Sequence, residues 1–237
     1  EKAGSVELLE RAADAIDDLP GDFDLVVVNS VAQYFPSLAY LQLVIERACQ
    51  RLAPGGHLFL GDLRSLSLQP AFAASLELHA APAATPLAAA HYGAWHQAAL
   101  DNELLVHPGL FALLQQQGRI GAVRVLPKDA RRVNELSKFR YDVVITRSDA
   151  QTTALPWSDW SGDGWDLAKL ERRLWQSGVV ALAGIPNARV ATDAHAARLL
   201  AEPGELKTVG ELRRAVAAAE TGIDPQALAE LAVASGR

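Results

Sequence analysis

The sequence predicts an α/β fold that forms the second half of a doubly wound sheet. Strands expected at 23–30 and 57–62 flank a helix expected at 37–52, so the three segments form a βαβ unit of about 40 residues with parallel strands. Helices and strands then continue to alternate up to residue 146. This alternation is typical of doubly wound folds.

The elements of the first half follow from local patterns. Residues 4–17 are expected to form a short strand or helix before a turn, and 23–30 a strand buried on both faces, because four aliphatic residues stand in a row. Apolar residues at helical spacing predict the helix at 37–52, with Ser37 as its N-cap. The Pro-Gly-Gly at 54–56 is expected to end that helix.

The next elements are less regular. Alanine-rich residues 68–81 predict a helix, whereas 82–95, with two prolines and Gly93, are expected to form a loop or lid. Three further elements are expected, namely a helix at 108–117 that opens at Pro108 and strands at 123–126 and 139–146.

A change of composition near residue 149 predicts two parts, 1–148 with the sheet and 149–237 as a mainly helical accessory region. Helices are expected there at 166–176, 208–219 and 225–234, with a strand at 179–182. The tryptophan cluster of Trp157, Trp160 and Trp165 is interpreted either as the small core of this region or as a docking face for a carrier protein.

Composition excludes several classes of protein. Of the 237 residues, 50% are hydrophobic and 21% charged, which predicts a globular chain. The net charge of −6 argues against nucleic-acid binding as the main role. No apolar run reaches the roughly 18 residues of a membrane span. One cysteine, Cys49, and six scattered histidines predict no metal site, and a reducing, cytoplasmic compartment is expected. Because the chain begins at Glu1 and lacks methionine, we expect it to be part of a longer functional unit.

Five stretches together resemble one family. They are FDLVVVNSVAQYFPSLAYL (23–41), LAPGGHLFLGDLRSLSL (52–68), ELLVHPGLF (103–111), NELSKFRYDVVI (134–145) and IPNARV (185–190). They resemble the S-adenosylmethionine-dependent methyltransferase domains embedded in nonribosomal peptide synthetases. The resemblance implies a class I methyltransferase (Rossmann-like) sheet, of which this chain would hold the C-terminal half, strands 4–7.

The same resemblance implies a cofactor and partners. The cofactor would be S-adenosylmethionine. The partners would be a carrier protein bearing a phosphopantetheine-tethered substrate, an adjacent adenylation domain and the N-terminal half of the same domain. The family's glycine-rich cofactor loop does not occur here, because Gly55-Gly56 precede a strand and Gly162-Asp163-Gly164 are expected to follow none. We expect that loop upstream of residue 1.

Polar residues at the end of the strand at 23–30 are the candidates for cofactor binding. Ligands bind at the carboxyl ends of strands in open α/β sheets, and in the family this stretch faces the methionine part of the cofactor and the acceptor. The candidates are Asn29, Ser30, Val31, Gln33 and Tyr34. The alternative interpretation is a polar strand-to-helix turn with an N-cap.

Asp62, Arg64 and Glu103 are candidate catalytic residues. Asp62 and Arg64 end the second strand, where they can orient or polarise an acceptor, unless they form an ordinary ion pair that closes the strand. Glu103 would act as a general base for an amine if it is partly buried.

The remaining catalytic candidates are His79 and Glu135. The family commonly has a His after the Phe that corresponds to Phe72; here Ala73 stands in its place, and His79 is the nearest replacement, unless it is an ordinary helix residue. Glu135 is either an acceptor-side residue or the partner of Arg132 or Lys138 in an ion pair.

Three functions remain open on the sequence. The first is methyl transfer to a nitrogen, or to a carbon, of a carrier-tethered aminoacyl or heterocyclic group. The second is epimerisation of a tethered thiazoline, as in siderophore-type synthetases, which the missing loop and Ala73 favour. The third is a non-catalytic structural insert.

Overall fold

The computed structural model describes residues 6–129, 132–148, 155–219 and 222–235. The chain forms two compact units, each assembled from separate stretches. The first unit comprises 1–63, 108–126 and 142–151, and the second comprises 64–107, 127–141 and 152–237. This division differs from the boundary at 148/149, which stays a prediction and adjoins residues that lie outside the described ones.

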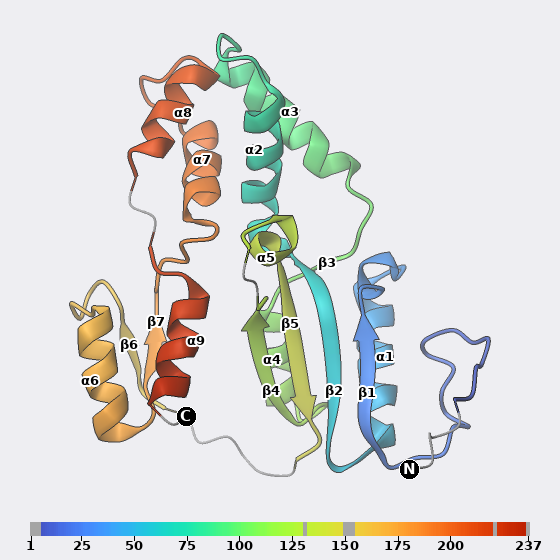
Figure 1. Ribbon diagram of the computed structural model, residues 1–237. Helices are drawn as coiled ribbons and strands as arrows, with labels where there is room; N and C mark the ends of the chain where they lie inside the picture. The colour runs from blue at the N-terminus through green and yellow to red at the C-terminus, as the bar shows by residue number, and fades with distance from the viewer. Residues whose placement is uncertain (1–5, 130–131, 149–154, 220–221, 236–237) are drawn as a thin grey trace. The chain divides into compact units, whose positions relative to one another are not determined.

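The main sheet has the strand order β1-β2-β5-β4, and a short strand β3 also pairs with β2 (Figure 1). The strands are β1 (Phe23–Asn29), β2 (Leu52–Ser65), β3 (Leu105–Val106), β4 (Ala122–Pro127) and β5 (Arg140–Thr146). Strands β1 and β2 are parallel, with Val26 opposite Leu58, and helix α1 (Leu38–Arg51) connects them. The predicted βαβ unit is therefore confirmed.

Strand β5 runs antiparallel to β2. His57 Nδ1 lies 3.0 Å from Thr146 Oγ1, and the backbone N–H of Asp62 donates to Asp142 Oδ1 at 2.9 Å. Residue numbers thus fall along β5 as they rise along β2, in agreement with the arrows in Figure 1. The last strand of this sheet, β5, inserts between the earlier strands β2 and β4. This order confirms the predicted second half of a doubly wound α/β sheet.

Helices α1 and α4 (Gly109–Gln116) cover one face of the sheet in the first unit (Figure 1). The predicted N-cap of α1 is confirmed, because Ser37 Oγ accepts a hydrogen bond from the N–H of Tyr40 at 3.1 Å. The apolar core of this unit includes Leu41, Val44, Ile45, Ala48, Leu52, Leu58, Leu60, Leu63, Phe111, Leu114, Val143 and Ile145.

Three predictions for this unit are wrong. Strand β1 is not buried on both faces: Leu25 and Val27 are 57% and 54% exposed, because the two helices lie on only one side of the strands. Strand β2 already begins at Leu52 and runs through the Pro-Gly-Gly segment. The described residues of the predicted strand or helix at 4–17 form turns and irregular chain.

The second unit contains a helical layer of α2 (Gln69–Ala80), α3 (Leu87–Leu100), α7 (Ala191–Ala201) and α8 (Val209–Ala217). These helices share an apolar core of Ala74, Ala81, Leu87, Ala90, Ala196, Leu200, Val209, Leu212 and Val216.

Helix α3 replaces the loop or lid that was predicted for 82–95. Both prolines of that segment precede the helix, and Pro86 is its N-cap. Gly93 lies inside the helix, where an added Cβ would come within 2.5 Å of the Glu77 carboxylate of α2. The glycine therefore serves close packing of two helices and not a loop.

The accessory region is not purely helical. The predicted helices are found as α6 (Leu167–Ser177), α8 and α9 (Pro225–Ala234), and the strand as β7 (Ala181–Ala183). A strand that was not predicted, β6 (Trp157–Asp159), pairs in parallel with β7. Contrary to prediction, the turn with Gly162 and Gly164 therefore follows a strand. Carboxylates close this turn, since Asp159 accepts from the N–H of Gly162 and Asp163 from that of Asp159.

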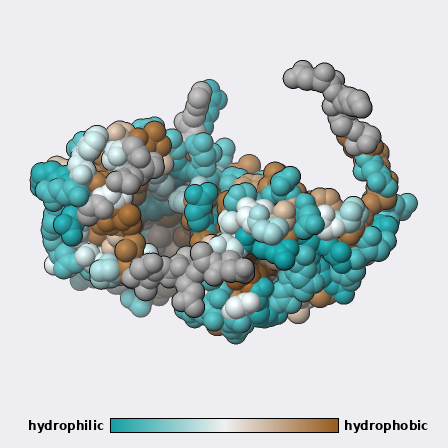
Figure 2. Space-filling view, turned by 90° about the horizontal axis from the view of Figure 1, so that it is seen from below, coloured by the Kyte–Doolittle hydropathy of each residue, from teal (hydrophilic) through white to brown (hydrophobic). Residues whose placement is uncertain are grey.

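Hydrophilic residues dominate the face seen in Figure 2, and hydrophobic residues form separate patches on it. None of the helices in the described part of the chain has the length and apolar character that crossing a membrane requires.

Candidate functional site

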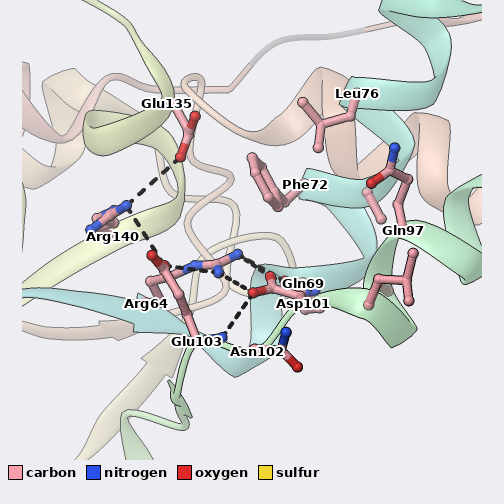
Figure 3. Close-up of a pocket in the computed structure, with 13 residues that line it drawn as sticks. Arg64, Gln69, Phe72, Leu76, Gln97, Asp101, Asn102, Glu103, Glu135 and Arg140 are labelled. Carbon is pink, nitrogen blue, oxygen red and sulfur yellow. Dashed lines mark hydrogen bonds and ion pairs between the residues drawn. The ribbon is translucent and has the colours of Figure 1, made fainter. Parts of the chain in front are cut away.

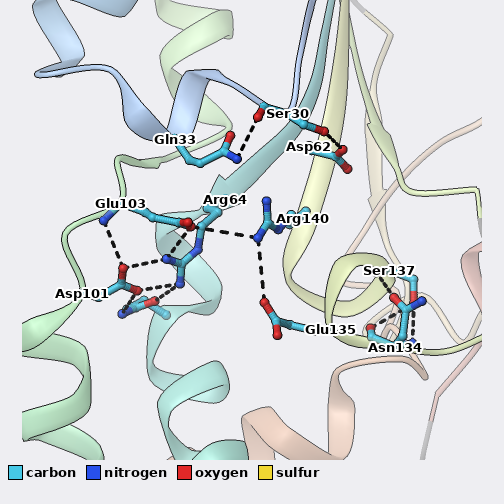
Figure 4. Close-up of polar contacts among 11 residues, drawn as sticks. Ser30, Gln33, Asp62, Arg64, Asp101, Glu103, Asn134, Glu135, Ser137 and Arg140 are labelled. Atoms are coloured by element: carbon cyan, nitrogen blue, oxygen red, sulfur yellow. Dashed lines mark hydrogen bonds and ion pairs between the residues drawn. The ribbon is translucent and has the colours of Figure 1, made fainter.

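The first group of polar residues lies at the ends of β1 and β2 in the first unit. Ser30 and Asp62 both adopt left-handed backbone conformations, with φ of 58° and 61°, which cost of order 1 kcal/mol for residues with a side chain. Their side chains form a hydrogen bond with each other (Figure 4). The N–H of Ser30 donates to the carbonyl of Gly61 at 3.1 Å. An added Cβ at Gly61 would collide with the Asn29 side chain. The ends of two adjacent strands thus adopt an uncommon backbone conformation, and hydrogen bonds between them stabilise it.

Gln33 supplies the second feature of this group. Its side chain is buried in the 3-10 turn Ala32–Tyr34, and its Nε2 donates to the Ser30 carbonyl at 3.0 Å. Its Oε1 is buried and accepts no hydrogen bond from any described residue. Of the five predicted cofactor residues, Gln33 alone is buried, and it contacts Ser30, which follows Asn29 directly. Asn29, Ser30, Val31 and Tyr34 are all exposed.

The second group lines a pocket of about 360 Å³ in the second unit (Figure 3). Its polar lining includes Arg64, Gln69, Asp101, Glu103, Glu135 and Arg140, and its apolar lining includes Phe72, Ala73 and Leu76. These residues come from the end of β2, from α2, from the loop between α3 and β3, and from α5 (Glu135–Phe139) with the first residue of β5. Three predicted catalytic residues, Arg64, Glu103 and Glu135, therefore share one pocket.

Arg64 is the most completely paired group in the pocket. Its two Nη atoms contact both oxygens of Asp101, at 2.7 and 2.6 Å, and Nη1 also contacts Glu103 Oε2 at 3.0 Å. The guanidinium carbon lies 5.2 Å from the centre of the Phe72 ring, which is a cation–π geometry. Asp101 also accepts from Gln69 Nε2 at 3.2 Å and from the N–H of Glu103 at 3.1 Å.

These contacts shift the pKa of both partners. Burial alone would lower the pKa of Arg64, but the hydrogen bonds and charges of Asp101 and Glu103 raise it overall. Burial alone would likewise raise the pKa of Asp101, but the hydrogen bond from Arg64 and further donors lower it overall. The pair is therefore fully ionised. Sequence reasoning missed Asp101, although it stands only two residues before the predicted Glu103.

Arg140 is held much more loosely. Its Nη2 lies 4.0 Å from Glu103 Oε2 and 3.8 Å from Glu135 Oε1, distances that are too long for hydrogen bonds. Its side chain is only 14% exposed, and its buried Nε has no hydrogen-bond partner within the described ranges. Glu135 is 55% exposed, so it contacts both the pocket and the solvent.

Helix α5 positions Glu135. Asn134 caps this helix, because its Oδ1 accepts from the N–H of Ser137 at 3.0 Å. Glu135 pairs with Arg140, whereas Lys138, one of its predicted alternative partners, pairs with Asp193 at 2.5 Å.

The other predicted residues lie elsewhere. Asp62 belongs to the group at the strand ends of the first unit. His79 is exposed near the end of α2 and lines a neighbouring hollow of the second unit with Lys138, and not the Arg64 pocket. Tyr141 has a structural role, because its buried hydroxyl donates to the carbonyl of Val106 at 2.9 Å. No cluster of three metal-ligating side chains occurs in the described part of the chain.

Comparison with known proteins finds relatives of this chain among peptide synthetases. No model of a known protein family matches it. It is 38% identical over 203 residues to chondramide synthase of Chondromyces crocatus, which covers 80% of this chain and 5% of that protein. It is 32% identical over 222 residues to the nonribosomal peptide synthetase agiA of Aspergillus flavus, a match that covers 87% of this chain and 3% of that protein. It is 38% identical over 167 residues to the beauvericin nonribosomal cyclodepsipeptide synthetase of Beauveria bassiana, a match that covers 69% of this chain and 5% of that protein.

A solved structure, an O-methyltransferase family protein from Burkholderia thailandensis, matches 61% of this chain and 36% of that chain with 18% identity and a TM-score of 0.38. The chain spans at most 5% of the length of the three synthetases named above. It is thus related to a short segment of nonribosomal peptide synthetases, and the predicted resemblance to that family is confirmed.

Proposed function

We propose that this segment of a nonribosomal peptide synthetase transfers a methyl group from S-adenosylmethionine to the amine nitrogen of an aminoacyl group tethered to a carrier protein. One observation carries the proposal: Glu103 and Glu135 flank the loosely held Arg140 in a pocket that is large enough for such a group. The partners would be the carrier protein and an adenylation domain, in the cytoplasm.

The carboxylates suit an amine acceptor. An α-amine has a pKa of about 8 in water, so it arrives largely as an ammonium ion, which carboxylates attract. It must lose a proton before its lone pair can attack a methyl group. Glu135 faces the solvent and Glu103 is partly buried, so one of them can take the proton while the other orients the amine.

The donor would be held in the first unit. S-adenosylmethionine, when bound, supplies an electrophilic methyl group. The residues after β1 fit such a ligand, because Gln33 Oε1 is a buried acceptor that no described residue satisfies. We assign Asn29, Ser30 and Gln33 to this role. Asp62 would support Ser30 through their hydrogen bond.

The test is intact-mass analysis of the loaded carrier protein. The full-length polypeptide is incubated with it in deuterated water, with and without S-adenosylmethionine. A mass gain of one methyl group that depends on the cofactor is the expected result. Gain of a single deuteron without the cofactor would contradict the proposal and favour the epimerase. No change on a correctly loaded substrate would favour a structural insert.

A further inference from the structure

We infer that Arg140 binds the carbonyl oxygen next to the acceptor amine, so that the pocket selects an α-aminoacyl thioester or amide over a free amino acid. This inference rests on the proposed function and adds to it a residue that recognises the acceptor.

The first argument is the unused hydrogen-bonding capacity of Arg140. Its guanidinium is largely buried, its contacts with Glu103 and Glu135 are too long for hydrogen bonds, and its Nε has no acceptor in the described part of the chain. Buried donors normally have a partner, because an unsatisfied one loses its hydration without compensation. Arg140 lines the pocket, and the contacts of its Nη2 with the two carboxylates are 4.0 and 3.8 Å long, so a ligand oxygen there can accept a hydrogen bond from this Nη2.

The second argument is the contrast with Arg64. That guanidinium contacts both oxygens of Asp101, one of Glu103, and the face of Phe72. Its hydrogen-bonding capacity is largely used within the protein. Arg140 is therefore the guanidinium of the pocket that is available to a ligand (Figure 3).

The third argument is charge. Two guanidiniums face three carboxylates in the pocket, which leaves one negative charge in excess. An aminoacyl thioester or amide adds an ammonium ion and a neutral carbonyl, so it balances this charge. A free amino acid also adds a carboxylate, which Arg140 would attract but which would lie close to Glu103 and Glu135 and leave the excess negative charge uncompensated. Like charges at this range are unfavourable in a partly buried site.

The geometry matches this division of roles. Arg140 lies between Glu103 and Glu135 (Figure 4). In an α-aminoacyl group, a single carbon separates the amine nitrogen from the carbonyl carbon. One such group can therefore donate from its amine to a carboxylate while its carbonyl oxygen accepts from Arg140.

The test measures binding, so that it does not depend on methyl transfer. The probe is the alanyl amide of N-acetylethylenediamine, a stable analogue of a cysteamine thioester, and free alanine is the comparison ligand. Dissociation constants are measured by calorimetry on the full-length protein. We expect the amide to bind at least about tenfold more tightly than alanine, and Arg140→Gln to weaken amide binding about tenfold through loss of one charged hydrogen bond.

Two further variants make the result specific. Arg132→Gln is the matched control, because Arg132 is exposed and does not line the pocket, and it should bind like the wild type. Arg140→Lys keeps the positive charge but lacks the planar guanidinium, so it should bind the amide more tightly than Arg140→Gln and more weakly than the wild type. This variant also keeps the inference testable if Arg140→Gln fails to fold.

Three results would overturn the inference: unchanged binding in both Arg140 variants, equal binding of alanine and the amide, or no binding of the amide to the wild type. These outcomes are separate from those of the mass experiment. If methyl transfer occurs but amide binding does not depend on Arg140, the proposed function stands and this inference fails. If amide binding depends on Arg140 but no methyl transfer occurs, only the proposed function is refuted.

Discussion

Arg64 and Arg140 line the same pocket, yet the two guanidiniums differ greatly in the hydrogen bonds and ion pairs that they form. Arg64 forms hydrogen bonds and ion pairs with Asp101 and Glu103, lies against Phe72, and is among the buried charged residues of the chain. Within the described residues, Arg140 makes two long ion pairs, and its buried Nε has no hydrogen-bond partner. The difference indicates that a charged residue in a pocket is a candidate for ligand binding when the protein leaves its hydrogen bonds unmade. A charged residue whose hydrogen bonds are made within the protein instead holds the lining of the pocket in place.

The largest expected effect comes from removing the fully paired arginine. Arg64→Met would leave Asp101 and Glu103 without their main partner, which should lower the free energy of unfolding by about 3–5 kcal/mol. Arg140→Met is the matched change and should cost no more than about 1 kcal/mol, because its ion pairs are long and partly solvated. Urea denaturation followed by circular dichroism measures both. Equal losses would contradict the contrast between the two arginines.

A smaller effect, with a defined pH dependence, is expected for Asp101→Asn. At neutral pH it should lower the free energy of unfolding by about 1–2 kcal/mol through loss of charged hydrogen bonds, after allowance for solvent screening. The folded-state pKa of Asp101 lies below its ordinary value of 3.8. Its contribution to stability is therefore complete well above pH 3.8 and is lost as the pH falls through the lowered pKa.

Denaturation curves of the wild type and Asp101→Asn between pH 7 and pH 3 check this point. The difference between them should shrink only at the acid end of the range. A constant difference throughout would mean that the carboxylate charge of Asp101 is not what stabilises the pocket.

The next smaller effect is expected from substitution of Phe72, an aromatic residue that lines the pocket. Phe72 lies under Arg64 and packs edge-on against Phe139, with ring centres 5.1 Å apart. Phe72→Leu should cost about 1 kcal/mol, since it removes both ring interactions but keeps most of the apolar volume. Phe72→Tyr keeps the ring and should cost clearly less in the same urea denaturation experiment. If both variants unfold alike, the ring face contributes nothing to holding Arg64.

The sequence alone was sufficient where local signals decide the structure. The helix after Ser37 and the parallel pairing of β1 with β2 follow from an N-cap, helical spacing and an aliphatic run. It failed where packing decides. Gly93 indicated a loop, but it lies in α3 because the Glu77 side chain of α2 needs the space.

The same distinction holds for the site. Arg64 and Glu103 were candidates because of their position beside expected strand ends and in family-like blocks, and the structure brings them within 3.0 Å. The partner that fixes Arg64, Asp101, is 37 residues away in the sequence, and no periodicity or motif links the two. The incomplete hydrogen bonding of Arg140 depends on contacts that a sequence pattern does not contain.

The smallest expected effect on stability belongs to Glu135, and it sharpens the contrast most. Glu135 is mostly exposed and 3.8 Å from Arg140, so Glu135→Gln should change the free energy of unfolding by no more than about 0.5 kcal/mol. It should nevertheless weaken binding of the alanyl amide severalfold, because it removes one carboxylate that attracts the ammonium ion. Binding of the corresponding propionyl amide, which has no amine, should not change. Glu205→Gln, a change at another exposed glutamate outside the pocket, should alter neither quantity. A Glu135 variant as unstable as Asp101→Asn would place this carboxylate with the structural side of the pocket, because a ligand-binding group should contribute little to the fold until its ligand is present.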